Sequence, residues 1–247
     1  MTAYHGGKQR IGKQLAEVIV DESIDIAEEE GIEIKGYCEP FCGMLGVFRH
    51  IPELFEDAGL FRLKYKAGDT NESVIKMWKA AVDGWRPPTK CTKKEYENLK
   101  YAKASAKKGF VGHQCSFGGK NFRGYVKERC TGTKIQNGSE NVREVAAELK
   151  NVKFTNTDYS QFSSLKGYII YCDPPYGKYS DYYDEDHRML SFDHEAFWQW
   201  CREMSKHNMI FISEYNAPKD FELITAIKSY VSYGSNQTQN EERLFFV

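Results

Sequence analysis

Apolar residues recur at intervals of three and four along much of the chain, which is the spacing of one face of a helix. Each such stretch predicts an amphipathic helix. The predicted helices lie at Ile11, Leu15, Val18 and Ile19; at residues 45–51, ended by Pro52; at Val74, Ile75, Trp78 and Val82; at Val142, Val145, Ala146 and Leu149; and at Phe197, Trp198, Cys201 and Met204. Asn71 or Ser73 is expected to cap the third of these helices, and Asp193 the last.

Short runs rich in β-branched and aromatic residues predict strands between the helices. These runs lie at residues 33–40, 63–67, 152–155, 168–172 and 209–213, and residues 230–247 predict two strands around a polar loop. Because strands alternate with helices, the sequence predicts an α/β fold, with a mostly parallel sheet covered by helices on both faces. Sheets of this kind bind ligands at the carboxyl ends of their strands.

A basic segment interrupts this alternation. Residues 86–134 contain 13 Lys and Arg but 3 Asp and Glu, a net charge of +10, so the rest of this chain of net charge −1 carries −11. The first half of the segment is helix-like and the second half, residues 109–138, is rich in glycine. Such a segment is typical of a module that faces a polyanion, although a solvated helix face is the alternative. We expect one domain, residues 1–85 and 139–247, with an insertion at residues 86–138.

The number and spacing of the cysteines and the hydropathy of the chain indicate in which cellular compartment the protein is expected. The 7 cysteines are an odd number and include no C-x-x-C pair, which argues against a disulfide framework or a zinc site. His113 and Cys115 are not spaced as metal ligands, so no metal is expected. No signal peptide or membrane-spanning stretch is apparent. We therefore expect an intracellular, cytoplasmic protein with no membrane partner.

The strongest chemical signal is the tetrad Asp173-Pro174-Pro175-Tyr176, which directly follows the predicted strand at residues 168–172. The two prolines stiffen this turn. The Asp173 carboxylate and the Pro174 carbonyl are two acceptors, and Tyr176 supplies a flat ring. Two acceptors and a ring suit a planar substrate that bears an amino group. The alternative is an acidic turn closed by prolines.

The ends of the first two predicted strands carry residues that suit a nucleotide-like cofactor. Glu39, Phe41 and Gly43 follow the first strand, where a glycine permits close backbone approach and a helix start supplies free N–H groups. Asp69 and Asn71 follow the second, where an acidic residue commonly accepts hydrogen bonds from a ribose. A packing glycine and a helix cap are the respective alternatives.

Three further segments carry weaker signals. Asp158 and Tyr159 end the strand at residues 152–155 and offer a carboxylate beside a ring, although alone they would indicate only a turn. Residues 4–10 place two glycines and two cations before the first helix. Residues 115–125 interleave glycines and aromatic rings with Lys120 and Arg123, a composition suited to phosphates and bases. Trp78, Trp198 and Trp200 are expected in the core.

Taken in order, these motifs resemble the Dam-type (D12 class) DNA adenine-N6 methyltransferases. The resemblance is carried by Tyr4-x-Gly6-Gly7-Lys8, Glu39-Pro40-Phe41-x-Gly43, Asp69-x-Asn71, Asp158-Tyr159 and Asp173-Pro174-Pro175-Tyr176. The segments 116–119, 213–218 and 242–245 resemble a branch of that class that phages and viruses encode. The resemblance implies a Rossmann-like class I methyltransferase fold whose last strand is antiparallel, and, for a virus-encoded enzyme, the host cell interior as its location.

The resemblance also implies a reaction, a cofactor and a set of site residues. The enzyme would transfer a methyl group from S-adenosylmethionine (AdoMet) to the N6 amine of an adenine flipped out of duplex DNA, with no metal. The flipped base would be bound by Asp173, Pro174, Pro175 and Tyr176. The cofactor would be bound by Tyr4, Gly7, Lys8, Glu39, Phe41, Gly43, Asp69, Asn71, Asp158, Tyr159 and Asp173. DNA would be contacted by Lys8, Arg10, Lys120, Asn121, Arg123 and Tyr125.

Two departures from the family pattern limit what the resemblance implies. Leu45 stands where the first cofactor loop usually has a second glycine, and a Dam-like recognition hairpin is absent between Phe110 and Tyr125. The target sequence therefore does not carry over. Rival hypotheses are an RNA adenine methyltransferase, a protein-glutamine N-methyltransferase and a nucleic-acid-binding protein without catalysis. The sequence leaves open whether the chain forms a homodimer and whether it serves restriction–modification, host evasion or regulation.

Overall fold

The computed structural model describes residues 2–176, 182–183, 189–190, 192–233 and 236–247. Its main sheet has the strand order β3-β2-β1-β4-β7-β9-β8. The strands are β1 Gly36–Glu39, β2 Lys64–Asp69, β3 Val152–Asn156, β4 Tyr168–Cys172, β7 Met209–Glu214, β8 Glu222–Tyr233 and β9 Asn236–Phe246. The first five strands of that order are parallel, and β9 runs antiparallel to both β7 and β8. This confirms the expected Rossmann-like methyltransferase sheet with an antiparallel last strand.

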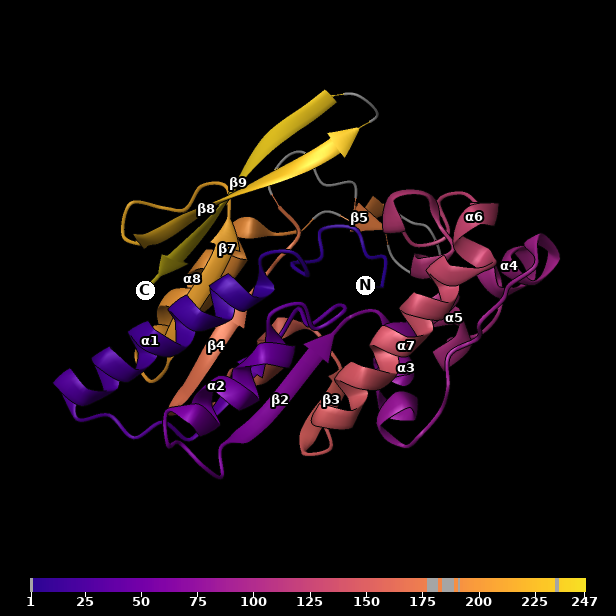
Figure 1. The fold of residues 1–247 in the computed structure, drawn as a ribbon. Coiled ribbons are helices and arrows are strands. Elements are labelled where there is room, and N and C mark those ends of the chain that lie inside the picture. The colour runs from indigo at the N-terminus through magenta and orange to yellow at the C-terminus, as the bar shows by residue number, and fades with distance from the viewer. Residues whose placement is uncertain (1, 177–181, 184–188, 191, 234–235) are drawn as a thin grey trace.

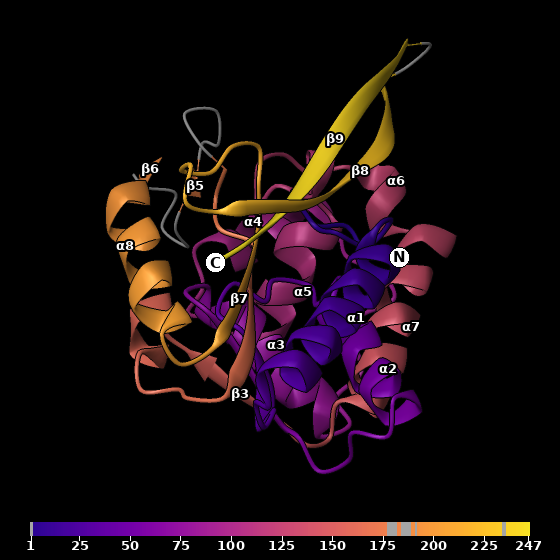
Figure 2. The same cartoon turned by 90° about the vertical axis from the view of Figure 1, so that its left-hand side faces the viewer.

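Successive residues of the central strands pack into two separate cores. The helices that cover the sheet are α1 Gly12–Glu30, α2 Ile51–Asp57, α3 Glu72–Val82 and α8 His194–Ser205. Tyr37, Ile169 and Tyr171 lie in the core under α1, α2 and α3, whereas Cys38 and Ile170 lie in the core under α8. Figure 2 shows α8 on one side of β7 and α1 and α2 on the other. The sheet is therefore covered on both faces, as predicted.

The helix caps and the buried tryptophans follow the sequence predictions. The Asn71 side chain accepts a hydrogen bond from the Val74 N–H at 3.1 Å and starts α3. Asp193 accepts one from the Ala196 N–H at 3.0 Å and starts α8. These caps satisfy backbone N–H groups that have no partner within the helix. Trp78, Trp198 and Trp200 are buried in the two cores.

The basic segment folds into helices beside the β3 edge of the sheet (Figure 1). These helices are α4 Lys93–Lys100, α5 Ala106–Gln114, α6 Lys127–Cys130 and α7 Thr133–Glu148. The prediction of a helix that resumes near Val142 was too short, because α7 begins at Thr133 and continues through Gly138. A side chain at Gly138 would place its Cβ 2.6 Å from the Gln114 side chain. This glycine therefore serves close packing between α5 and α7 and does not mark a loop.

The prediction of a helix at residues 45–51, ended by Pro52, was wrong. Residues 48–50 form a short 3-10 helix, and α2 begins at Ile51 with Pro52 in its first turn. Proline lacks a backbone N–H, but the N–H groups of the first turn have no partner within the helix. Pro52 is therefore tolerated at the start of a helix that it was expected to end.

The C-terminal strands are longer than predicted. β8 begins at Glu222, before the predicted start at residue 230, and β9 includes the polar residues 236–242. In the described part of the chain, residues 236–242 pair with β8, whereas Arg243 to Phe246 also pair with β7. A two-stranded ribbon that extends beyond the rest of a sheet has no buried face, so its sequence needs no alternation of apolar residues. The apolar pattern used to predict strands therefore does not show the extent of this part of β9. In both views the β8–β9 hairpin extends beyond the carboxyl ends of the parallel strands (Figures 1 and 2).

A small two-stranded sheet, β5 Tyr182–Tyr183 and β6 Met189–Leu190, lies between β4 and α8 in the sequence. None of the helices that the structure describes is long and apolar enough to cross a membrane.

Candidate active site

The N-terminal motif and the proline tetrad meet at the carboxyl end of β4. The Lys8 Nζ donates to the Asp173 Oδ1 at 2.6 Å and to the Gly6 carbonyl at 3.1 Å. The same nitrogen lies 4.6 Å from the centre of the Tyr176 ring. The Lys8 side chain is 8% exposed and that of Asp173 19%. This group lies where the strand order reverses, between β1 and β4, which is the point where open α/β sheets bind ligands.

Close backbone packing holds the N-terminal segment in place. A Cβ at Gly12, the first residue of α1, would lie 1.9 Å from the Gly46 carbonyl oxygen, so only glycine fits there. The Ile11 N–H donates to the Lys8 carbonyl at 3.1 Å and leads the turn into α1. The start of α1 is thereby fixed against the loop that follows β1, and this contact positions Lys8.

Glu242, from β9, completes the charged group. Its Oε1 accepts a hydrogen bond from the Tyr176 hydroxyl and lies 3.5 Å from the Lys8 Nζ. The Tyr176 ring also packs edge-on against Tyr215, with centroids 4.9 Å apart. Burial lowers the pKa of Lys8, but the carboxylates of Asp173 and Glu242 outweigh it and raise the pKa overall. Burial raises the pKa of Glu242, and Lys8 opposes that rise.

The Asp69 carboxylate organises the loop after β1. It accepts hydrogen bonds from the Gly43 N–H at 2.9 Å and from the Asn71 N–H at 2.8 Å. The Trp78 ring N–H donates to the Gly43 carbonyl at 2.9 Å from the other side. The structure thus brings together three predicted cofactor residues at the ends of β1 and β2.

Leu45 stands where the family pattern has a second glycine, and its backbone adopts a conformation typical of glycine. It has a φ of 54°, in the left-handed region that glycine usually occupies, and its side chain is fully buried. A left-handed conformation costs a non-glycine residue about 1–2 kcal/mol. Burial of a leucine side chain contributes about 1.5–3 kcal/mol, which offsets that cost.

Glu39 lies at the end of β1, near the charged group formed by Lys8, Asp173 and Glu242. Its side chain is buried and accepts a hydrogen bond from the Tyr37 hydroxyl at 2.7 Å. Burial raises the pKa of Glu39 well above its usual value, and the negative charge of Asp173 adds to that rise. Burial thus disfavours the charged form of this carboxyl group.

The end of β3 presents one exposed carboxylate and one packed ring. Asp158 is exposed and accepts a hydrogen bond from the Ser160 N–H at 3.0 Å. Tyr159 stacks on Phe41 at a centroid distance of 5.6 Å, and both contact Phe192 and Phe197. Burial raises the pKa of Tyr159 to about 12. Phe41 and Tyr159, predicted from separate motifs, thus belong to one aromatic cluster.

The predicted DNA contacts divide into exposed and internal groups. Arg10, Lys120 and Arg123 are exposed, whereas Lys8 is buried against Asp173 and the Tyr125 hydroxyl donates to the Cys91 carbonyl at 3.0 Å. Asn121 is half-buried.

Two other cations of the basic segment are also engaged within the protein. Lys107 pairs with Glu95 at 3.2 Å, and the buried Lys108 donates to the Ala102 carbonyl at 2.8 Å. The charge available to a partner from this segment is therefore smaller than its composition indicates.

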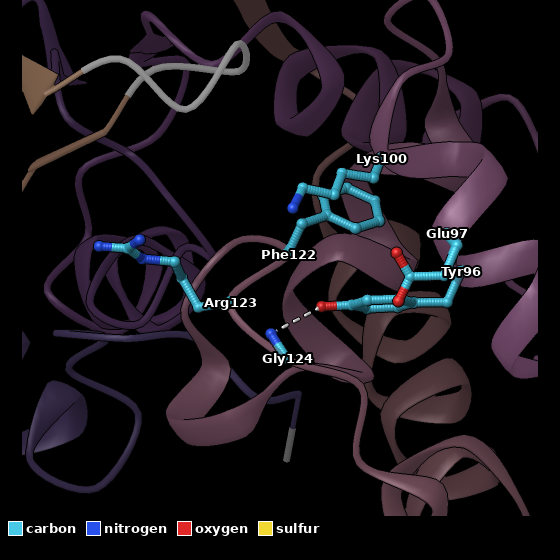
Figure 3. Close-up of a pocket in the computed structure, with 6 residues that line it drawn as sticks. All are labelled: Tyr96, Glu97, Lys100, Phe122, Arg123 and Gly124. Carbon is cyan, nitrogen blue, oxygen red and sulfur yellow. Dashed lines mark hydrogen bonds between the residues drawn. The ribbon is translucent and has the colours of Figure 1, made fainter.

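A shallow pocket of about 290 Å³ opens between α4 and the loop at residues 122–124. Figure 3 shows Lys100 beside Phe122, while Arg123 points away from both. The Gly124 N–H donates to the Tyr96 hydroxyl at 3.2 Å and ties the loop to α4. The lining combines the nearly buried rings of Tyr96 and Phe122 with the charged side chains of Glu97 and Lys100.

Residues 3–5 connect the basic segment to the active site. The His5 N–H donates to the Gly119 carbonyl at 3.2 Å, and a Cβ at Gly119 would lie 2.7 Å from the Tyr4 nitrogen. The Tyr4 ring packs on His113 with centroids 4.5 Å apart, and it also lies against Gly43. One short stretch of chain thus touches both the loop at residues 117–120 and the loop after β1.

The comparison with known families decides the class of the protein. The family model described as D12 class N6 adenine-specific DNA methyltransferase matches residues 114–241, just over half of the 247-residue chain. The chain belongs to this D12 class. It is therefore an adenine-specific DNA methyltransferase, and DNA is its substrate. The match includes the tetrad at Asp173 and the loop at Lys120, and it does not distinguish a phage or virus branch.

Two other comparisons add little to this assignment. Structures that match this methyltransferase include a crystal structure from Haemophilus influenzae, described as a putative methylase, with 10% identity and a TM-score of 0.30. That match covers 92% of this chain and 98% of the other. The search of curated proteins gives no match. The fold assignment rests instead on the strand order and the family match.

The structure adds one acidic residue that the motif analysis did not select. Glu242 was noted only within a segment that resembles related enzymes, and no local signal marks its contact with Tyr176, 66 positions away. Among the described residues of this D12 methyltransferase, no group of three or more His, Cys, Asp and Glu could hold a metal ion.

Proposed function

We propose that this methyltransferase transfers the methyl group of AdoMet to the N6 amine of an adenine that is flipped out of duplex DNA into the Asp173–Tyr176 site. The observation that carries the proposal is the 2.6 Å contact between Lys8 and Asp173, which joins the N-terminal motif to the tetrad beside the loop after β1. Flipping a base costs a few kcal/mol, which contacts with the pocket and the DNA backbone offset.

The residues present fit AdoMet by their charge. Asp69, Asp158 and Asp173 place carboxylates at the ends of β2, β3 and β4, next to the loop that contains Gly43. With both carboxylates ionised, Lys8, Asp173 and Glu242 together carry −1. When bound, AdoMet supplies an electrophilic methyl group on a positively charged sulfonium, which this net charge complements.

The proposed cofactor set is the one predicted from the sequence. Gly7, Lys8, Phe41 and Gly43 would hold the methionine end. Asp69 would hold the ribose, and Asp158 and Tyr159 the adenine. Tyr4 and Asn71 would support these cofactor residues, because Tyr4 lies against Gly43 and the Asn71 N–H donates to Asp69. Glu39 would support them from the end of β1, where the Tyr37 hydroxyl holds its side chain.

The chain's own residues would prepare the target amine. Adenine N6 is a poor nucleophile because its lone pair is delocalised into the ring. Asp173 and the Pro174 carbonyl would accept its two N–H groups and favour a pyramidal nitrogen, while Tyr176 stacks on the base and Pro175 stiffens the turn. As it becomes a secondary amine, the nitrogen would release one proton to water. Such positioning accounts for a large part of rate acceleration.

We further propose that residues 86–138 form the DNA-recognition region, inserted between the two parts of the catalytic domain. Lys120 and Arg123 are exposed on it and suit the DNA backbone. Helix α7 crosses residue 138 without a break, so it would belong to both parts. The contacts of residues 3–5 with this region link recognition to the site at Lys8.

The test is transfer of labelled methyl groups from AdoMet to unmethylated duplex DNA, by the wild type beside Asp173→Ala, with the product nucleosides resolved. We expect N6-methyladenine with the wild type and a loss on the order of 1,000-fold or more in the variant. The variant should fold, because Glu242 remains 3.5 Å from Lys8 and keeps its charge paired. Circular dichroism and AdoMet binding check this.

Parallel reactions on single-stranded RNA and on protein extract complete the design. Label in RNA or in glutamine side chains, with none in DNA, would contradict the proposal, as would normal turnover by Asp173→Ala. Binding of DNA without binding of AdoMet would indicate a protein that has lost catalysis.

A further inference from the structure

Glu242 belongs to the charged group of the active site, and in the function proposed above it contributes only its negative charge. It lies on β9, one residue beyond the segment that matches the family. Its side chain is 13% exposed, accepts a hydrogen bond from the Tyr176 hydroxyl and lies 3.5 Å from the Lys8 Nζ. A buried carboxylate in this position has a cost in desolvation, which calls for a function.

Asp173 is already engaged by a stronger donor than the target amine. Its Oδ1 accepts a charge-assisted hydrogen bond from the Lys8 ammonium at 2.6 Å. Hydrogen bonds to charged groups are roughly twice as strong as those between neutral groups. While it holds Lys8, the Asp173 Oδ1 is therefore a weaker acceptor for a neutral adenine amine. When the amine is to bond to this same oxygen, the ammonium needs a second acceptor.

Glu242 is placed to be that acceptor. An ammonium has three N–H groups, of which one serves the Gly6 carbonyl at 3.1 Å and one serves Asp173. The Glu242 oxygen, at 3.5 Å, lies at the outer limit of hydrogen-bond distance, so its contact with Lys8 is weaker than that of Asp173 at 2.6 Å. A shift of the Lys8 nitrogen by about 0.5 Å would shorten it to an ordinary hydrogen bond.

We propose that Glu242 is a positioning residue of the methyl-transfer site, which takes the Lys8 ammonium from Asp173 and so frees Asp173 to accept the target amine. The inference rests on the proposed function. Only hydrogen bonds are exchanged in this step: the proton stays on Lys8 and the three groups keep their total charge of −1. The pKa of Lys8 agrees with this: burial lowers it, but the two carboxylates raise it overall and keep the ammonium charged.

The principal test is Glu242→Gln, which keeps the size of the side chain and an acceptor for Tyr176 but removes the charge that attracts Lys8. We expect kcat to fall by about 10- to 100-fold. KM for DNA should stay within about threefold, because the exchange matters only when the amine is activated. The control is Glu241→Gln, the same charge change one residue away, where the side chain is 38% exposed and pairs with Arg243. It should keep wild-type kcat.

Tyr176→Phe separates the contact of Glu242 with Tyr176 from its contact with Lys8. It removes the hydroxyl that donates to Glu242 and keeps the ring and the Lys8 contact. If Glu242 acts through Lys8, Tyr176→Phe should lose several-fold less kcat than Glu242→Gln. Equal losses in the two variants would assign Glu242 to holding Tyr176 and would overturn the proposal.

The activities of Glu242→Gln and of the wild type also separate this inference from the proposed function. A Glu242→Gln enzyme with wild-type kcat would overturn the inference and leave the proposed function standing, whereas a wild type that methylates no DNA would contradict both. Should Glu242→Gln fail to fold, Glu242→Asp keeps the charge but is too short to reach Lys8. It should fold and lose at least about tenfold in kcat; full activity would contradict the proposal.

Discussion

Positive charge is used in opposite ways in two regions of this methyltransferase. In the active site, Lys8 is buried between the carboxylates of Asp173 and Glu242. In the basic segment, Lys120 and Arg123 are exposed to solvent. A buried charge depends on its few partners, because water does not replace them, whereas an exposed charge is screened by salt and is one of many. Single substitutions should therefore have large effects in the first region and small, salt-dependent effects in the second.

The largest effect is expected from Lys8→Met. The variant leaves Asp173 and Glu242 buried without their common counter-charge. Removal of one partner from a buried ion pair typically costs about 3–5 kcal/mol. We expect a loss of this size in the free energy of unfolding at pH 7, measured by urea denaturation.

The double variant Lys8→Met, Asp173→Asn is the control. It removes one of the two carboxylates as well, so it should recover most of the lost stability. A single variant that loses less than about 1 kcal/mol would show that Lys8 is no more dependent on its partners than a surface lysine.

The sequence was sufficient for the parts of the site that local patterns describe. The tetrad at Asp173 follows a short apolar run, and Asp69 follows another, so each could be placed at the end of a strand. Strand ends of a parallel sheet lie along one edge, which predicted that the motifs come together. The class of enzyme followed from the order of these motifs.

Contacts between distant residues could not be predicted in this way. Lys8 and Asp173 are 165 positions apart, and their contact depends on packing of α1 against the loop at Gly46. Glu242 reaches the site only because β9 turns back beside β7. The start of α2 at Pro52 was missed because proline both ends helices and begins them.

His113 of the basic segment packs on Tyr4, in the stretch at residues 3–5 that joins this segment to the active site. It gives a second test of how buried and exposed charges differ. Its Nδ1 donates to the Gly119 carbonyl at 3.0 Å, and its Nε2 has no hydrogen-bond partner among the described residues. Burial lowers the pKa of His113 to about 4. The unfolded chain takes up a proton near pH 6.5, and the folded protein does so only near pH 4. Stability is therefore lost as the pH falls through this window.

The expected loss is about 3 kcal/mol between pH 6.5 and pH 4, at about 1.4 kcal/mol per pH unit. His113→Gln keeps a donor for Gly119 and does not titrate, so its stability should fall less over this window. Urea unfolding of both proteins at several pH values measures the difference. Above pH 6.5 the two should change in parallel. If the free energy of unfolding falls equally steeply with pH in the wild type and in His113→Gln below pH 6.5, His113 is not the cause of the loss of stability in acid.

The smallest effect is expected from Lys120→Ala combined with Arg123→Ala, because these exposed cations act on DNA through a screened interaction. Each phosphate contact contributes about 0.9 to the slope of log affinity against log salt concentration. Loss of two contacts should therefore reduce the drop in affinity between about 50 and 200 mM salt by about tenfold. Lys35→Ala with Lys64→Ala makes the same charge change at the amino ends of β1 and β2, where both side chains are exposed, and should keep the wild-type slope. If both double variants reduce the salt dependence of DNA affinity equally, DNA binding depends on net charge alone and the basic segment is not the specific contact. If only Lys120→Ala with Arg123→Ala reduces it, the position of an exposed charge matters in this enzyme, as the position of the buried charge at Lys8 does.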